Sequence, residues 1–287
     1  MRFLPWAVCL LSLLAGPALA AGGLEVWPAQ AEQGQPLLVK ACPGQPAPGA
    51  EISLEGRRAP LAPAPGGCLV GAVGVDLDEP TGPALLEIRQ GERVLLSRRL
   101  TIKARGYGTR QITVDGKFME LKPEDLARHQ EETAKQKAVY ASRLPSMLWS
   151  GPWQTPLDSA VVGVFGRRSL VNGQPRSPHG GVDLRGGVGT PVKAPAVGRV
   201  ALVLDTYFSG LLVLIDHGLG VVSGYRHLSR AMVEQGRVVQ PGQVIGLVGA
   251  SGRVTGPHLH FDVRLAGARV DPLAWILASR QLDRWAR

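Results

Sequence analysis

Residues 256–263 read Gly-Pro-His-Leu-His-Phe-Asp-Val, a turn signal followed by alternating polar and apolar side chains. A period of two is typical of a half-buried β-strand, on which His258 and His260 share one face. Leu259 and Phe261 then lie on the opposite face. Two imidazoles side by side on a strand are well placed to hold a metal ion, although a polar edge strand would show the same pattern. This segment therefore predicts both a strand and a candidate site.

Further strand signals surround this segment from about residue 156 onward. The predicted strands are 161–165, 198–204, 211–215, 220–228, 244–248 and 259–263, separated by Gly and Pro turns. Evenly punctuated strands favour an antiparallel β-sandwich or barrel-like domain over alternating β and α units. Asp271-Pro272 then predicts the start of a short terminal helix that includes Trp275 and Ile276.

A second group of strand signals lies earlier in the chain, in residues 21–104. Apolar runs such as 36–39, 84–88 and 93–96 alternate with Gly/Pro clusters, which predicts a small N-terminal β-sandwich. The composition agrees, because 37 glycines and 23 prolines among 287 residues indicate many short elements joined by turns. We therefore expect a mainly β protein with domains at 21–104 and 151–287.

The linker, residues 105–150, carries the strongest helix signal, over 123–142. Pro123 occupies the first position, acidic residues follow in the first turn, and oppositely charged pairs recur at four-residue spacing. The apolar stripe of this helix is thin and consists of Leu126, Ala134, Tyr140 and Leu144. We expect a connecting helix laid against one domain, with a free solvent-bridging helix as the alternative.

Residues 1–20 have the pattern of a signal peptide, with Arg2, a short apolar run and Ala18-Leu19-Ala20 at the end. The run is shorter than the ~20 residues of a membrane-spanning helix, so we expect cleavage and no membrane span afterwards. The protein is then periplasmic or extracellular. In such an oxidising compartment Cys42 and Cys68 are expected to form a disulfide, with two free thiols as the alternative.

The net charge of +9 is concentrated in the C-terminal region. Lys+Arg minus Asp+Glu is 8 − 9 = −1 for 21–104, 8 − 6 = +2 for 105–150 and 15 − 8 = +7 for 151–287. A basic face attracts an anionic partner such as nucleic acid, anionic lipid or an acidic polymer, and export argues against nucleic acid. An arginine bias spread over solvated surface is the alternative. An apolar content of 45% and a charged content of 19% exclude a disordered chain.

Five of the six histidines fall within residues 179–260, which suggests a shared site. His179-Gly180-Gly181-Val182-Asp183 places a histidine on a loop and a carboxylate at a strand start, within reach of one ion. Gly224-Tyr225-Arg226-His227-Leu228 aims a further histidine at the same cleft. A hydrolytic zinc ion needs three N/O ligands, an open fourth position and a nearby base. These segments and the His-Leu-His strand offer five candidates without assigning their roles.

These motifs resemble the lysostaphin/LytM-type family of zinc peptidoglycan endopeptidases. The resemblance covers about residues 155–278 and rests on HGGVD (179–183), YRHL (225–228) and GPHLHF (256–261), supported by TPV (190–192), PGQVIG (241–246) and VDPL (270–273). It implies a LytM-type peptidase domain in which His179, Asp183 and His260 hold one Zn²⁺. It also implies that His227 and His258 are the catalytic pair. One would take the proton of the attacking water and the other would stabilise the oxyanion or protonate the leaving amine.

Three other residues have open roles. His217 matches a position that the family does not use as a ligand, so we expect it to be structural. Asp262 shares a face with His258 and His260, and either orients an imidazole or is an exposed strand carboxylate. His129 lies on the linker helix and is expected in solvent.

One departure from the family concerns the oxyanion. Some members place a tyrosine shortly before the first ligand, whereas residues 165–178 contain none. Asn172 or Arg176 could substitute for it.

The sequence thus predicts a secreted or periplasmic zinc metallo-endopeptidase that hydrolyses the peptide crosslinks of peptidoglycan. The alternative is a non-enzymatic wall-binding protein or an activator of other cell-wall hydrolases, because some relatives have lost their metal ligands. All five positions are filled here. The cleaved bond, D-alanyl-diaminopimelate or glycyl-glycine, stays open. The domain 21–104 could recognise the wall, position the enzyme or cover the cleft.

Overall fold

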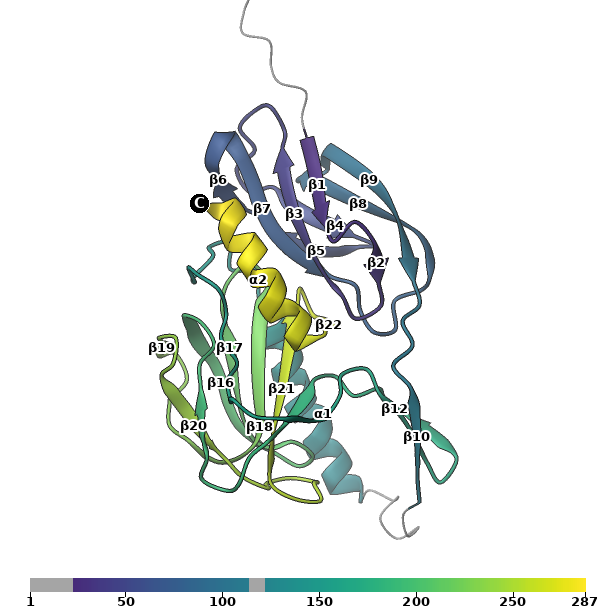
Figure 1. Cartoon of the computed structure of the whole chain (residues 1–287), viewed down its shortest axis with the longest axis vertical. Coiled ribbons are helices and arrows are strands. Elements are labelled where there is room, and N and C mark those ends of the chain that lie inside the picture. Colours follow the sequence, from purple (N-terminus) through teal and green to yellow (C-terminus); the bar gives the residue numbers. More distant parts are fainter. Residues whose placement is uncertain (1–22, 114–121) are drawn as a thin grey trace, which may run out of the picture.

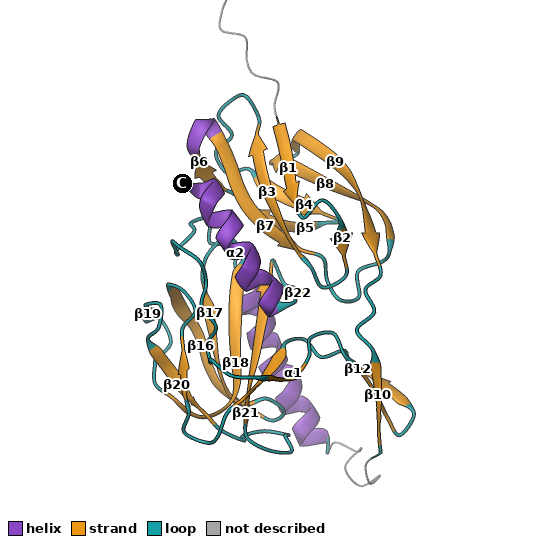
Figure 2. Ribbon diagram, in the orientation of Figure 1, coloured by secondary structure: helices purple, strands orange, loops and turns teal. Residues whose placement is uncertain are grey.

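The computed structural model of the chain describes residues 23–113 and 122–287. The predicted signal peptide, 1–20, and part of the predicted linker lie outside the described residues. Two β-rich domains follow one another along the long axis, and the linker elements lie beside the C-terminal domain (Figure 1). Strands dominate both domains (Figure 2), which confirms the mainly β prediction.

The N-terminal domain consists of two sheets that enclose an apolar core, in agreement with the predicted small β-sandwich. One sheet has the order β1 (Gly23–Trp27), β3 (Pro36–Cys42), β7 (Cys68–Gly74) and β6 (Ala62–Ala64), with the 3-10 turn η1 (Pro65–Gly67) before β7. The other has the order β2 (Ala31–Glu32), β9 (Arg93–Lys103), β8 (Gly82–Gln90), β4 (Glu51–Leu54) and β5 (Arg57–Pro60). A disulfide joins Cys42 to Cys68 on the neighbouring strands β3 and β7, which confirms the predicted pairing.

The C-terminal domain is built on one strongly bent antiparallel sheet. Its main path is β11 (Val161–Gly163), β14 (Val182–Arg185), β21 (His258–Leu265), β18 (Val221–Ala231), β17 (Gly210–Asp216), β16 (Gly198–Thr206) and β19 (Val238–Val239). Off this path, β20 (Val244–Val248) pairs with both β18 and β15 (Pro191–Lys193), and β22 (Ala268–Val270) pairs with β21. All six strands predicted from the sequence are therefore present.

The linker contributes two elements to the C-terminal domain. Strand β10 (Thr109–Ile112) joins β12 (Arg168–Val171) and β13 (Gln174–Arg176) in a small three-stranded sheet. Helix α1 (Pro123–Tyr140) ends two residues before the predicted end and lies against the C-terminal domain, so it does not bridge solvent freely.

Helix α1 packs through a polar face, and the apolar stripe predicted for it is wrong. Leu126 and Leu144 are 45% and 37% exposed, and of the predicted stripe only Tyr140 is buried. The contacting face instead includes Glu132, whose carboxylate accepts the backbone N–H of Tyr207 at 3.0 Å. The surface that meets α1 offers the N–H donors of Tyr207 and Arg226, which polar side chains of the helix satisfy and apolar ones would not.

The terminal helix α2 (Pro272–Ala286) joins the two domains. Asp271 caps it by accepting the backbone N–H of Leu273 and Ala274, and the helix, predicted to be short, has 15 residues. Its apolar face contacts strands of the N-terminal sandwich as well as β21. One continuous core consequently contains residues of both domains, among them Leu38, Val70, Ala72, Leu77, Trp153, Trp275 and Leu282.

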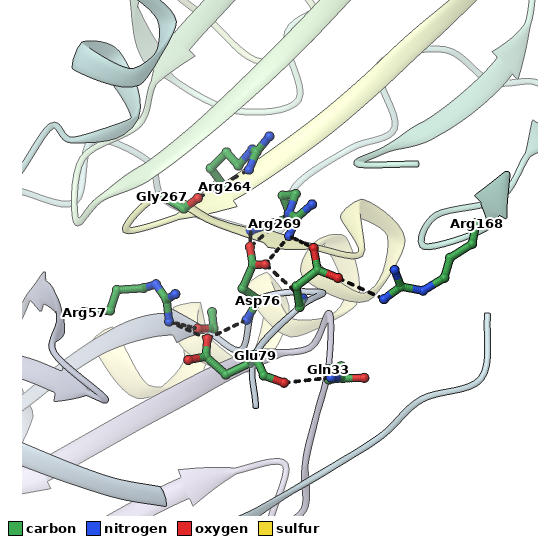
Figure 3. Close-up of polar contacts among 10 residues, drawn as sticks. Gln33, Arg57, Asp76, Glu79, Arg168, Arg264, Gly267 and Arg269 are labelled. Atoms are coloured by element: carbon green, nitrogen blue, oxygen red, sulfur yellow. Dashed lines mark hydrogen bonds and ion pairs between the residues drawn. The ribbon is translucent and has the colours of Figure 1, made fainter. Parts of the chain in front are cut away.

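An ion network reinforces this junction (Figure 3). Asp76 of the sandwich accepts the backbone N–H of Arg269 at 2.8 Å, its Nε–H at 3.1 Å and a further bond from Nη2. Asp78 accepts from Arg269 at 2.7 Å and from Arg168 at 2.9 Å. Burial alone would raise the pKa of Asp76, but the hydrogen bonds and the charge of Arg269 lower it to about 2. The pair is thus ionised at neutral pH and holds the domains together.

Candidate metal centre

Three of the predicted ligands converge on one point. Antiparallel pairing of β14 and β21 places Asp183 opposite His260, and the loop before β14 supplies His179. Asp183 Oδ1 lies 3.0 Å from His179 Nε2 and 2.9 Å from His260 Nδ1, and the two nitrogens are 3.0 Å apart. All three residues are partly buried.

This donor set fits a metal ion. His179 Nδ1 lies 2.9 Å from the carbonyl oxygen of Val164, which can only accept, so the ring proton sits on Nδ1 and Nε2 presents its lone pair. Two imidazoles and a carboxylate are ligands that zinc uses in catalytic sites. Tetrahedral zinc with bonds of about 2.0 Å holds its ligand atoms about 3.3 Å apart, close to the separations found here.

The electrostatics keep the carboxylate ionised. Burial would raise the pKa of Asp183, yet its close contacts with the imidazoles of His179 and His260 hold it well below its usual range. Burial lowers the pKa of His260, while contact with Asp183 raises the pKa of His179 against the effect of burial. A bound cation would be stabilised by the ionised carboxylate and the imidazole lone pairs that meet at this point.

The two remaining histidines lie beside this triad. The ring centroids of His227 and His258 are 4.9 Å apart, and His258 Nε2 is 3.7 Å from Asp183 Oδ1. His258 Nδ1 is 2.9 Å from the carbonyl oxygen of Gly256, and His227 Nδ1 is 3.0 Å from that of Ser251. Each imidazole therefore donates from Nδ1 to the backbone and keeps Nε2 unprotonated when neutral.

The backbone at His227 explains how this side chain reaches the site. His227 has φ of +64°, an uncommon conformation for a residue other than glycine, and the pairing of β18 with β17 shifts register across it. Such a bulge redirects a side chain that regular alternation would place elsewhere. Burial, opposed by the bond to Ser251, lowers the pKa of His227 to about 4, so the ring is neutral and able to accept a proton.

Glycines allow the ligand strands to approach closely. A Cβ at Gly181 would lie 2.8 Å from His260 Nε2 and overlap the carbonyl oxygen of Phe261. A Cβ at Gly163 of β11 would overlap the carboxylate of Asp183. Gly181 of the HGGVD segment thus makes room for the side chain of His260.

A buried charge pair lies next to the centre, and the sequence did not predict it. Arg226 donates from Nε to Asp262 Oδ2 at 2.9 Å, from Nη2 to Tyr140 Oη at 2.6 Å and from Nη1 to Gln136 Oε1 at 2.8 Å. Asp262 is 2% exposed, so the exposed-carboxylate alternative is wrong, and its partner is Arg226. This network ties α1 to β18 and β21, two residues from the ligand His260.

The site opens into a groove of about 1310 Å³ that contains all five predicted site residues. Helix α1, the loop 251–257 and Arg110 of β10 contribute to its walls. Within the described part of the chain, no residue of 23–104 lines it. Among the three roles considered for the N-terminal domain, covering the cleft is therefore the one that this arrangement does not support.

The other singled-out residues have different surroundings. His217 is fully buried away from the groove, with Nδ1 2.7 Å from the carbonyl oxygen of Val197 and Nε2 2.8 Å from Ser223 Oγ. His129, expected in solvent, is half-buried, with its ring 4.7 Å from that of Phe208. Asn172 lies in the turn between β12 and β13 and does not line the groove, and the side chain of Arg176 is outside the described part. None of the described helices has the length and apolar character needed to cross a membrane.

Comparisons with known proteins agree with this geometry. The sequence profile of Peptidase family M23 matches residues 177–272. Peptidoglycan DD-endopeptidase ShyA of Vibrio cholerae serotype O1 is 31% identical over 192 residues, which are 65% of this chain and 43% of that protein. Murein hydrolase activator EnvC of Escherichia coli is 43% identical over 88 residues, 31% of this chain and 21% of that protein. The chain thus spans less than half the length of these curated relatives.

A solved structure matches over a larger share. The crystal structure of a Pseudomonas aeruginosa protein assigned to peptidase M23 has 31% sequence identity and a TM-score of 0.63, and the match covers 85% of this chain and 93% of that chain. Likeness on this scale includes the N-terminal sandwich as well as the domain with the metal centre.

Proposed function

Because the chain belongs to peptidase family M23, we propose that it is a zinc metallo-endopeptidase that hydrolyses the peptide crosslinks of peptidoglycan. The observation that carries this proposal is the convergence of His179, Asp183 and His260 with two further imidazoles, those of His227 and His258, in one groove. A purely wall-binding protein or an activator of other hydrolases needs no such constellation. The retained site thus favours an enzyme over the activator alternative.

The chemistry follows from the donor set and the two neighbouring imidazoles. His179, Asp183 and His260 would hold the zinc ion. When bound, zinc makes water acidic enough to ionise near neutral pH and polarises the scissile carbonyl. His227 and His258 each keep an unprotonated Nε2, so either can take a proton from the attacking water. The other then donates a hydrogen bond to the developing oxyanion or a proton to the leaving amine.

Two further features support the substrate and the location. The relative named as a peptidoglycan DD-endopeptidase favours the D-alanyl-diaminopimelate crosslink over the glycyl-glycine bridge. The disulfide between Cys42 and Cys68 is consistent with an oxidising compartment, such as the periplasm or the cell exterior. A basic domain of net charge +7 also suits an anionic wall.

The decisive experiment is mass spectrometry of the muropeptides released from purified sacculi by the exported chain, with and without a chelator, alongside His258→Ala. We expect crosslinked dimers to be converted to monomers only when zinc and His258 are both present. Circular dichroism would verify that the variant is folded. If the folded, zinc-loaded protein releases nothing from several wall types, the enzyme proposal is wrong and the activator alternative gains weight.

A further inference from the structure

The charged side chains that line the groove beside the metal centre are mainly cationic. Its charged lining comprises seven cations and two carboxylates, namely Arg110, Lys137, Arg143, Arg226, Arg253, Arg264 and Arg269 against Asp183 and Asp262. Asp262 is paired with Arg226, and Arg269 with Asp76. Within the described part of the chain, Arg253 has no carboxylate within 4.0 Å and therefore forms no ion pair. The groove therefore concentrates anions, and Arg253 is available to bind one.

Arg253 is held in a fixed orientation. Its backbone N–H donates to the carbonyl oxygen of Phe208 at 2.9 Å, and its guanidinium lies 4.9 Å from the centroid of the Phe208 ring. The Phe208 ring is itself edge-on to His129 at 4.7 Å and to Tyr207 at 4.9 Å. This cation–π contact holds the guanidinium next to the ring without using its N–H donors. Those donors form a planar fork that matches a carboxylate.

The loop that carries Arg253 also positions the catalytic pair. This loop connects β20 to β21, and its carbonyl oxygens at Ser251 and Gly256 receive the Nδ1–H bonds of His227 and His258. Ser251 Oγ anchors the loop by donating to the carbonyl oxygen of Leu228 at 2.8 Å. A carboxylate bound by Arg253 would consequently lie at a set position relative to the bond that is cleaved.

Helix α1 supports the platform on which Arg253 stacks. Both carboxylate oxygens of Glu132 lie within 3.2 Å of the backbone nitrogen of Tyr207, which accounts for the fixed position of the loop before β17. This helix lies outside residues 177–272, the part that matches the family profile. The support for Arg253 thus comes from a segment that the profile does not include.

We propose that Arg253 is a specificity-determining residue that binds a free carboxylate of the crosslinked peptide close to the scissile bond. This inference rests on the proposed function and deepens it, since it names the chemical group that the groove selects. Peptides in which that carboxylate is converted to a carboxamide are then poorer ligands and poorer substrates.

The test compares binding of two peptide dimers that share a D-alanyl-diaminopimelate crosslink, one with free carboxylates and one with carboxamides in their place. Calorimetry on zinc-loaded His258→Ala protein measures affinity without turnover. We expect a preference of about 10-fold or more for the carboxylate form, because charge-assisted bidentate bonds are strong. Combining Arg253→Gln with His258→Ala abolishes the preference, because only the affinity for the carboxylate dimer falls. Arg253→Lys in the same background retains part of the preference. Arg199→Gln, which removes an exposed arginine outside the groove lining, leaves it intact.

The outcomes separate the inference from the proposed function. Equal binding of the two dimers, or an equal loss for both in Arg253→Gln, overturns the carboxylate subsite. Cleavage by the zinc-loaded protein with His258 restored is measured in parallel. A carboxylate preference without any cleavage would support the subsite and refute the endopeptidase proposal. Cleavage of both dimers without a binding preference would support the endopeptidase proposal and refute the subsite.

Discussion

Replacing Asp76 by asparagine tests whether the two domains act as one unit. The carboxylate accepts three hydrogen bonds from Arg269 across the domain junction, and its side chain is 17% exposed. The difference between its ordinary pKa of 3.8 and about 2 in the fold corresponds to roughly 2 kcal/mol. Partial solvent screening lowers that value, and Asp78 still pairs with Arg269 in the variant. We expect a loss of about 1 to 2 kcal/mol at pH 7.

The assay is urea unfolding followed by tryptophan fluorescence, since Trp153 and Trp275 lie in the shared core. The folded pKa of Asp76 is depressed, so its contribution is present above pH 3.8 and is lost as the pH falls towards 2. The gap between wild type and Asp76→Asn should therefore close over that interval. Asp158→Asn, which alters an exposed aspartate, is the control. Two separate wild-type transitions, or a variant as stable as wild type at pH 7, would refute the reasoning.

Three further predictions concern the site and its support. Gly181→Ala should weaken zinc binding about 10-fold or more in a competition titration, because the new Cβ meets His260. The control Gly180→Ala, whose new Cβ has its nearest contact at 3.7 Å, should leave zinc affinity unchanged. Equal zinc affinities in the two variants would contradict this prediction. Tyr140→Phe should cost about 2 kcal/mol in urea unfolding, since it removes the hydroxyl bonded to the buried Arg226, while Tyr207→Phe should cost little. Burial lowers the pKa of His217 to about 4, so the unfolded state binds more protons below pH 6.5 and stability should fall by up to about 3 kcal/mol between pH 6.5 and 4. His217→Gln should reduce this dependence of the free energy of unfolding on pH. An unchanged slope in the variant would contradict the prediction.

The strands of the C-terminal domain and the shared face of His258 and His260 were predictable because both depend on short-range patterns. Alternation of apolar residues located the six strands of the C-terminal domain, and the His-x-His spacing fixed which two imidazoles share a face. The triad itself needed the family resemblance, because pairing of β14 with β21 is a long-range contact that spacing does not encode. The disulfide followed from there being two cysteines in one predicted exported domain.

The polar supports of the site were not predictable in the same way. The sequence predicted a connecting helix with a thin apolar stripe laid against one domain, but most of that stripe is exposed, and polar contacts such as that of Glu132 with the loop before β17 depend on the tertiary fold. Arg226 and Asp262 look like solvent-exposed strand residues until the fold brings their side chains together on the neighbouring strands β18 and β21, where Arg226 also bonds to Tyr140. Nothing local marks His227 for a left-handed backbone conformation either.

The boundary between the domains in sequence is not a mechanical boundary. Helix α2 belongs to the C-terminal domain by position, yet it buries Leu38 and Val70 of the sandwich in the same core as its own Trp275. Swinging the sandwich away would expose this apolar surface and break the pair of Asp76 with Arg269. Because Arg269 also lines the groove, the junction reaches the site directly, through β22. The sandwich therefore acts on the peptidase domain as a fixed support, and any adjustment of the groove has to come from α1 and the loop 251–257, which form its walls.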